Sequence, residues 1–172
     1  MATLIERAMG AAKLDRGTFE EIERDPEALG QAAVVVIAAA LASGVGALDR
    51  GVAGVVAGTI GSLIAWLLWA GITYLIGTRV LPGRHTEADF GQVLRTLGFA
   101  AAPGVLGVLG VIPLLGALII LALAIWQLAA MVVAVRQVFD YETTGRAVGV
   151  CLLGFLAYVL VGSIFLSPFA HP

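Results

Sequence analysis

Long stretches without Asp, Glu, Lys or Arg alternate with short charged segments along this chain. They cover residues 28–48, 51–78, 96–135 and 147–172. One helical crossing of a bilayer needs about 20 apolar residues. The third stretch is about twice as long, and Gly110 to Pro113 in its middle predict a turn. The pattern therefore predicts an all-α polytopic membrane protein with a five-helix transmembrane bundle, spanning residues 28–48, 52–77, 96–111, 114–135 and 147–167.

Residues 1–27, which we call the head, are polar and carry a helical pattern. They hold seven acidic and four basic side chains, which is atypical of a signal peptide. Five apolar residues recur on one helix face, namely Leu4, Ile5, Ala8, Met9 and Ala12. The sequence thus predicts a short amphipathic, helical N-terminal segment. Its apolar face either lies in the membrane interface or packs on the protein itself, and both interpretations stay open.

Two local signals predict further helix starts within the head. Thr18 and Glu21 have the spacing of a capping box, which indicates a second helix from about residue 18. Asp25 followed by Pro26 is typical of an N-cap and a first helical residue. We expect the helix that begins there to continue directly into the membrane.

The distribution of basic residues predicts the orientation. Cytoplasmic segments of membrane proteins carry an excess of Lys and Arg. With the N-terminus inside, nine basic residues lie on the cytoplasmic side and Arg50 alone lies outside. The sequence therefore predicts a multi-pass protein of the cell (inner) membrane, with a cytoplasmic N-terminus and an external C-terminus.

Composition excludes several classes of protein. The 172 residues are 60% apolar and 13% charged, with a mean hydropathy of +1.00, far from a soluble domain. A net charge of −2 is too balanced for a nucleic-acid binder. Cys151 is the only cysteine, and His85 and His171 lie far apart in the sequence. We therefore expect no intrachain disulfide, metal site or cofactor.

The predicted spans hold no Asp, Glu, Lys, Arg or His well inside them. Ionisable groups within a bilayer usually mark ion or substrate paths. Their absence argues against a proton-coupled transporter and an intramembrane protease, and we expect no catalytic residue.

Gln127 is the most polar side chain at membrane depth. It could line a small polar cavity or bind a lipid headgroup that is drawn inward. The commoner role of such a residue is a hydrogen bond between helices. Both interpretations remain open at the level of sequence.

Small residues follow one face of the second predicted span, at Gly54, Gly58 and Gly61. Gly54 and Gly58 have the small-x-x-x-small spacing that lets helices approach closely. This face predicts close packing, either within one molecule or in a homo-oligomer.

Proline marks both ends of the third predicted span. Pro103 cannot donate a backbone hydrogen bond and should kink or interrupt the helix, and Pro113 lies in the predicted turn. No charged residue accompanies the break, so a structural kink is the simpler interpretation.

Several motifs resemble the YIP-domain family of Ypt/Rab-interacting proteins, specifically its small bacterial branch. They are the stretches 74–77, 90–103, 111–113, 133–137 and 144–147, together with Trp126. The family's signature of a glycine followed by aromatic-x-x-x-Pro maps onto Gly98, Phe99 and Pro103; Pro113, Trp126 and Arg146 also match. The resemblance covers about residues 28–165 and implies five spans with a cytoplasmic N-terminus.

The resemblance implies a role in organising membranes rather than a reaction. Eukaryotic members act in vesicle traffic with small GTPases through a long cytoplasmic region, whose motifs are not found in this short head. Small-GTPase binding is therefore not supported. We expect a non-enzymatic integral membrane protein that organises the lipid bilayer or partner membrane proteins; the alternative is a small permease, channel or lipid-handling protein without proton coupling.

Three arginines at the ends of the predicted spans are candidates for lipid-headgroup contacts: Arg95, Arg136 and Arg146. Basic side chains near a membrane surface attract anionic lipids. Asp140 and Glu142 lie near them in the sequence and could pair with them instead, so this alternative also stays open.

Overall fold

The computed structural model describes residues 2–44, 51–84 and 86–166. Arg50, His85 and the tail with His171, on which parts of the orientation and metal-site predictions depend, lie outside the described residues. The same holds for the predicted span ends at residues 48 and 167.

Two short helices form the head. Helix α1 (Leu4–Ala12) begins at Thr3, which forms a capping box with Glu6. Helix α2 (Arg16–Arg24) begins at Asp15, whose carboxylate accepts the backbone N–H of Thr18 at 2.8 Å. The predicted cap at Thr18 was therefore wrong, because the aspartate three residues earlier accepts that N–H and starts the helix sooner.

Apolar helices follow the head. They are α3 (Ala28–Gly44), α4 (Gly51–Leu75) with the π-helical turn η2 (Ile76–Val80), α5 (Phe90–Phe99), the 3-10 helix η3 (Ala102–Val111), α6 (Gly116–Val138) and α7 (Thr144–Leu166). By length and composition, four segments can cross a membrane: Gly51–Val80, Phe90–Val111, Gly116–Val138 and Thr144–Val161. Helix α3 is shorter, at 17 residues. The chain is thus a polytopic helical protein.

The third apolar segment is interrupted between α5 and η3. Helix α5 ends at Phe99, four residues before Pro103. A proline ring clashes with the carbonyl of the residue four positions earlier and removes one hydrogen bond. The chain therefore leaves the α-helix at Phe99 and continues as a 3-10 helix, with Pro103 near its start.

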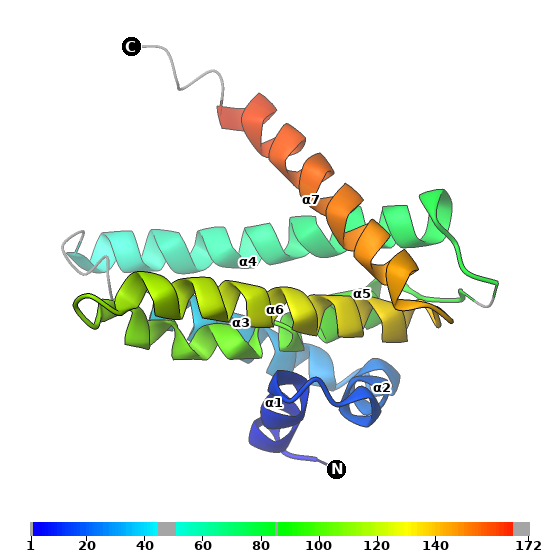
Figure 1. Cartoon of the computed structure of the whole chain (residues 1–172), viewed down its shortest axis with the longest axis horizontal. Helices are drawn as coiled ribbons and strands as arrows, with labels where there is room; N and C mark the ends of the chain where they lie inside the picture. Colours follow the sequence, from blue (N-terminus) through cyan, green and yellow to red (C-terminus); the bar gives the residue numbers. More distant parts are fainter. Residues whose placement is uncertain (1, 45–50, 85, 167–172) are drawn as a thin grey trace.

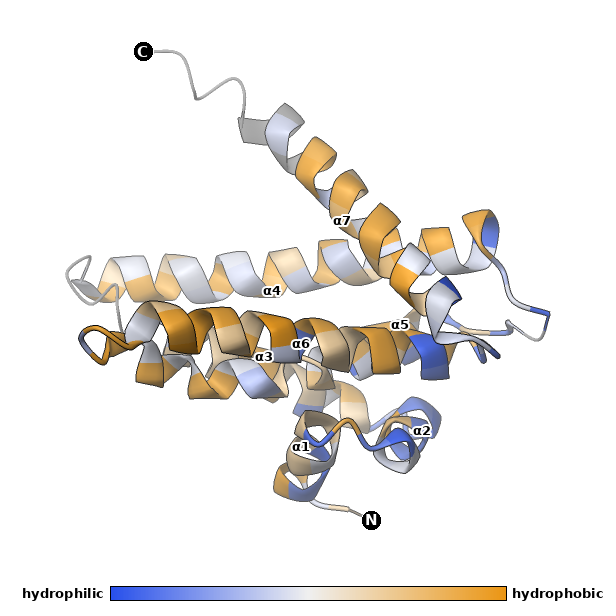
Figure 2. Cartoon of the chain, viewed as in Figure 1, coloured by the Kyte–Doolittle hydropathy of each residue, from blue (hydrophilic) through white to orange (hydrophobic). Residues whose placement is uncertain are grey.

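Two of the helices, α4 and α7, lie outside a more closely packed group (Figure 1). Helices α3, η3 and α6 pack together, while α4 contacts α3 and α5. Helix α7 packs on α6 and α4 near its start, and its later part diverges obliquely from the other helices (Figure 1). Hydrophilic residues gather in the head and in the loops at one end of the bundle (Figure 2).

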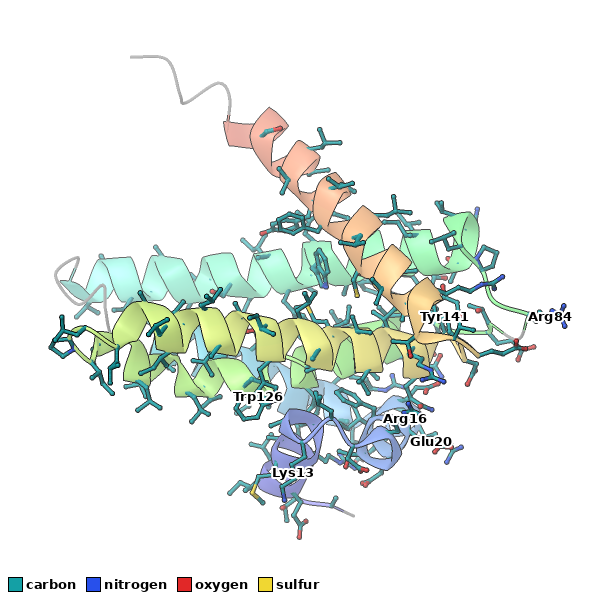
Figure 3. The ribbon with its side chains drawn as sticks, viewed as in Figure 1. Lys13, Arg16, Glu20, Arg84, Trp126 and Tyr141 are labelled. Atoms are coloured by element: carbon teal, nitrogen blue, oxygen red, sulfur yellow. The ribbon has the colours of Figure 1, made fainter. Side chains whose placement is uncertain are left out.

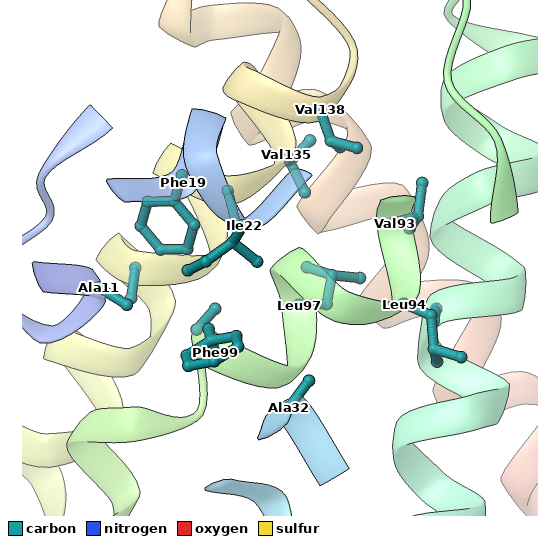
Figure 4. Packing of buried hydrophobic residues seen from close by; sticks show 14 of the residues in the cluster. Ala11, Phe19, Ile22, Ala32, Val93, Leu94, Leu97, Phe99, Val135 and Val138 are labelled. Atoms are coloured by element: carbon teal, nitrogen blue, oxygen red, sulfur yellow. The ribbon is translucent and has the colours of Figure 1, made fainter. Parts of the chain in front are cut away.

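The buried core lies where the head meets the bundle. Phe19 and Ile22 of α2 point toward Leu97 and Phe99 of α5, and all four are at most 1% exposed (Figure 4). Val135 of α6 completes this cluster. Helix α2 is therefore part of the folded core. The apolar face of α1 is divided, since Leu4, Ala8 and Ala12 pack partly against the core whereas Ile5 and Met9 are exposed, so both interpretations of that face stay open.

Candidate functional site

The first candidate site is the junction between the head and the bundle, where Arg95 of α5 is central. Arg95 is only 7% exposed, and its Nε donates to the carbonyl oxygens of Ile22 and Glu23, both at 2.9 Å. A second guanidinium nitrogen also donates to Glu23. The last carbonyls of a helix lack partners within the helix, and basic side chains often satisfy them. Arg95 thus terminates α2, and its guanidinium is not presented to lipid headgroups.

The C-terminus of α1 is likewise capped by a side chain from the bundle. Trp126 of α6 donates its indole N–H to the carbonyl of Ala12 at 2.6 Å, and Figure 3 shows it between α6 and α1. Ala12 is the last residue of α1. Both head helices are therefore capped by side chains of membrane helices.

Arg7 connects the parts of the head to one another. It is 2% exposed and pairs with Glu21 at 2.9 Å and with Asp25 at 2.6 Å. Its guanidinium also donates to Gln31 of α3 at 3.1 Å. The hydrogen bond from Arg7 holds the pKa of Asp25 below its usual value. No local sequence pattern indicates this role, because the partners lie 14 to 24 residues away.

Glu23 is the titratable group of the junction. Its carboxylate accepts from Gln92 at 3.3 Å. Burial, and secondarily the nearby Asp140, raise the pKa of Glu23 to about 7. Its charge therefore changes near neutral pH, at the point where α2 meets α5.

The other two candidate arginines, Arg136 and Arg146, have hydrogen-bond partners within the protein. Arg136 donates to the carbonyls of Tyr141 and Glu142 and to the hydroxyl of Thr144. Arg146 is exposed and donates to the carbonyl of Pro82 at 3.1 Å. Contact of these two side chains with lipid headgroups stays a prediction.

The second candidate site is a cavity between the membrane helices, which we call the central groove. It has a volume of about 370 Å³ and is lined by α3, α4, α5, α6, α7 and the start of η3. Its polar lining residues are Ser43, Ser62, Trp66, Trp69, Gln127 and Tyr158. Among the described residues, no Asp, Glu, Lys, Arg or His lines it. The groove can therefore accept an uncharged ligand of small-molecule size.

Gln127 lies at the middle of α6 and lines the central groove. A Cβ added at Gly104 would lie 3.3 Å from its Oε1, so the glycine leaves room for the amide. The side chain makes no hydrogen bond to any described residue. Gln127 thus lines the cavity, and its role as a polar site in the membrane stays a prediction.

The glycines of the predicted packing face differ from the signature glycine. A Cβ at Gly98 would lie 2.8 Å from the Cβ of Ala32, so Gly98 allows α5 to approach α3 closely. Gly58 and Gly61 have no atom within 4 Å of such a Cβ. Within one molecule this part of α4 is not closely packed, and a role of Gly54, Gly58 and Gly61 in an oligomer stays a prediction.

The remaining signature residues fall in separate places. Phe99 belongs to the buried core, and Pro103 is buried at the start of η3. Pro113 is exposed in the turn before α6. The signature therefore marks the interruption of the third segment and its packing against the head, and not a cluster of reactive groups.

The apolar helices, the interrupted third segment and the docked head define an integral membrane protein. A family comparison matches the Yip1 domain over residues 15–164. The chain therefore belongs to the Yip1 domain family, a family of non-enzymatic membrane proteins. No curated protein and no solved structure matches the chain.

Proposed function

We propose that this protein is non-enzymatic and organises the membrane, or partner proteins within it, through its docked head. The observation that carries the proposal is the position of α1. Ile5 and Met9 are 67% and 49% exposed although α1 is fixed to the bundle through Trp126. An amphipathic helix with exposed apolar residues beside membrane helices is suited to enter the lipid next to the bundle. Membership of the Yip1 domain family supports a membrane-organising role.

The proposed mechanism is insertion into one leaflet. Helix α1 would add volume to the cytoplasmic leaflet without crossing the bilayer, which favours curvature of the membrane. The contacts of Arg7 and Arg95 hold the head against the bundle, so the inserted helix stays at a fixed place beside the spans.

This mechanism can be tested with vesicles. The full chain is reconstituted into liposomes, and their radii are measured by electron cryomicroscopy. We expect the protein to shift the population toward smaller radii, and the double substitution Ile5→Ser and Met9→Ser to remove at least half of the shift. The matched control, Ile5→Leu with Met9→Leu, keeps the apolar surface and should act like the unchanged protein. Equal radii for the serine and leucine variants would contradict the proposal.

The proposed topology has five crossings, with the N-terminus in the cytoplasm and the C-terminus outside the cell membrane. Its support is the nine-to-one distribution of basic residues and the 17 residues of α3, the lower limit for a crossing. In a Cys151→Ala background, single cysteines are placed at positions 49, 84 and 171. An impermeant thiol reagent added to intact cells should label 49 and 171 but not 84. Labelling of position 84 alone would invert the topology.

A second candidate function is that of a small permease, channel or lipid-handling protein. The observation that favours it is the central groove, which has polar but uncharged walls at the middle of α6. Coupling to protons needs a group that exchanges a proton within the membrane. We therefore expect liposomes with the protein to hold an imposed pH gradient as long as empty liposomes do. Protein-dependent proton flux that a single carboxylate substitution abolishes would contradict this expectation.

A further inference from the structure

Polar groups without partners gather beside the central groove. The indole Nε1 of Trp69 and the hydroxyl of Thr73 are buried and have no hydrogen-bond partner among the described residues. Thr73 lies one helical turn after Trp69 and is 0% exposed. The amide of Gln127 and the hydroxyl of Tyr158, both of which line the groove, also make no hydrogen bond to a described residue. These groups come from α4, α6 and α7.

The hydroxyl of Thr73 differs from those of other threonines in the same bundle. Thr59, Thr78 and Thr96 each donate to the carbonyl four residues earlier, at 2.7 to 2.9 Å. Such a bond satisfies a hydroxyl inside its own helix. The hydrocarbon core of a bilayer holds no water that could form a hydrogen bond, so an N–H or O–H without a partner there costs free energy. Thr73 itself does not line the groove, but Trp69, Gln127 and Tyr158 do, and these three indicate an occupant that carries hydrogen-bonding atoms.

The lining residues of the groove favour an occupant without charge. Because no charged side chain lines the groove in the part of the chain that the structure describes, a phosphate or an ammonium group would be buried there without a counter-charge. An uncharged polar group carries no such penalty. The remaining walls are aliphatic or aromatic, including Val36, Leu97 and Met131, and fit a hydrocarbon chain.

The donors and acceptors of Trp69 and Gln127 further restrict which uncharged ligand fits the groove. The indole of Trp69 can only donate, so the ligand needs an acceptor such as an ester carbonyl. The amide of Gln127 both donates and accepts, so a full set of bonds also needs a donor such as a hydroxyl. An isoprenoid quinone offers acceptors only, whereas a diacylglycerol carries two ester carbonyls and one hydroxyl.

We infer that the central groove binds the glycerol end of a diacylglycerol, with Gln127 and Trp69 as its hydrogen-bonding partners. Trp69 and Tyr158, whose ring centroids are 5.9 Å apart in an edge contact, line the groove together from α4 and α7. The inference names the ligand class of the lipid-handling function proposed above as the second candidate, and is independent of the head. Binding is measured apart from transport, so a failure of either is recognised separately.

The test uses quenching of tryptophan fluorescence by brominated lipids. The Trp126→Phe variant keeps Trp66 and Trp69, which both line the groove. The full chain is placed in nanodiscs of phosphatidylcholine, and dibrominated diacylglycerol or dibrominated phosphatidylcholine is added in steps. We expect quenching by the diacylglycerol to saturate at a low mole fraction, and quenching by the phosphatidylcholine to grow in proportion to its amount.

Two substitutions link the saturable quenching to the groove. Gln127→Leu removes the amide at nearly constant volume and should weaken diacylglycerol binding at least tenfold. The matched control, Gln137→Leu, lies on the same helix but not in the groove, and should change binding less than twofold. Ala65→Leu, which adds volume to the groove wall, provides a second route to the same loss if Gln127→Leu does not fold.

Three results would overturn the inference. Identical quenching curves for both brominated lipids would show that the groove has no preference for diacylglycerol. Saturable binding that survives both Gln127→Leu and Ala65→Leu would place the lipid elsewhere. Displacement of brominated diacylglycerol by an equal mole fraction of an isoprenoid quinone would assign the groove to the quinone instead.

Discussion

Removal of the Arg95 guanidinium should detach α2 from the bundle. Arg95 donates to the carbonyls of Ile22 and Glu23 while it is almost fully buried. Hydrogen bonds that involve a charged group contribute about 1.5–3 kcal/mol. Because every 1.4 kcal/mol is a factor of ten, Arg95→Ala should increase the undocked fraction of the head about 10- to 150-fold.

Hydrogen–deuterium exchange measures this undocking directly. The protein is compared in detergent with and without Arg95→Ala, and exchange is followed in peptides that cover 16–24 and 116–138. We expect exchange of the first peptide to accelerate by the factor above, while the α6 peptide keeps its rate. Arg95→Lys should give an intermediate result, because an ammonium group cannot reproduce the planar fork that reaches both carbonyls.

Arg146→Ala is the matched control for this experiment. Arg146 donates to Pro82, away from the head, so its loss should leave exchange in α2 unchanged. The reasoning is refuted if Arg95→Ala leaves α2 as protected as before. Equal acceleration in α2 and α6 would also refute it, because the whole fold would then depend on Arg95.

Two further predictions concern packing and pH. Gly98→Ala should lower the melting temperature in detergent by several degrees, because the new Cβ would lie 2.8 Å from the Cβ of Ala32 and overpacking costs about 1–3 kcal/mol. Gly58→Ala should not lower it, because a Cβ at Gly58 would have no atom within 4 Å. An equal loss in both variants would contradict this packing argument. Docking raises the pKa of Glu23 from 4.5 to about 7, so its contribution to docking is complete below pH 4.5 and is lost as the pH rises through 7. Exchange in α2 should therefore accelerate between pH 5 and 8 after correction for intrinsic rates, and Glu23→Gln should remove this dependence; a dependence that persists in that variant would assign it to another group.

Local signals predicted much of the fold. The apolar stretches correctly indicated a polytopic helical protein, because a bilayer imposes a length on each crossing. Four helical segments are long and apolar enough to cross, α3 is shorter at 17 residues, and the number of five crossings stays a prediction. Pro103 predicted an interruption, and the clash of its ring with the carbonyl of Phe99 accounts for where α5 ends. The start of α2 was missed, because Asp15 and Thr18 both offer a cap and the sequence does not show which one accepts the backbone N–H.

The candidate functional sites depend on contacts between residues that are far apart in the sequence, and no local sequence pattern predicts such contacts. Arg95 looked like a lipid-facing residue, since its position at a span end is typical of headgroup contacts. Its partners in α2 lie more than 70 positions earlier in the chain, and only the folded structure brings them together. The same holds for the central groove, where Trp69, Gln127 and Tyr158 come from three helices.

The capping of the head by later helices has a consequence for synthesis of the protein. Ala12 and its donor Trp126 are 114 positions apart, and a ribosome adds about 5–20 residues per second, so α1 waits roughly 6–23 s for its cap. During that time Phe19 and Ile22, the core residues of α2, have no helix to cover them. The apolar face of the nascent head is therefore uncovered until the segments of α5 and α6 that bury it have been synthesised.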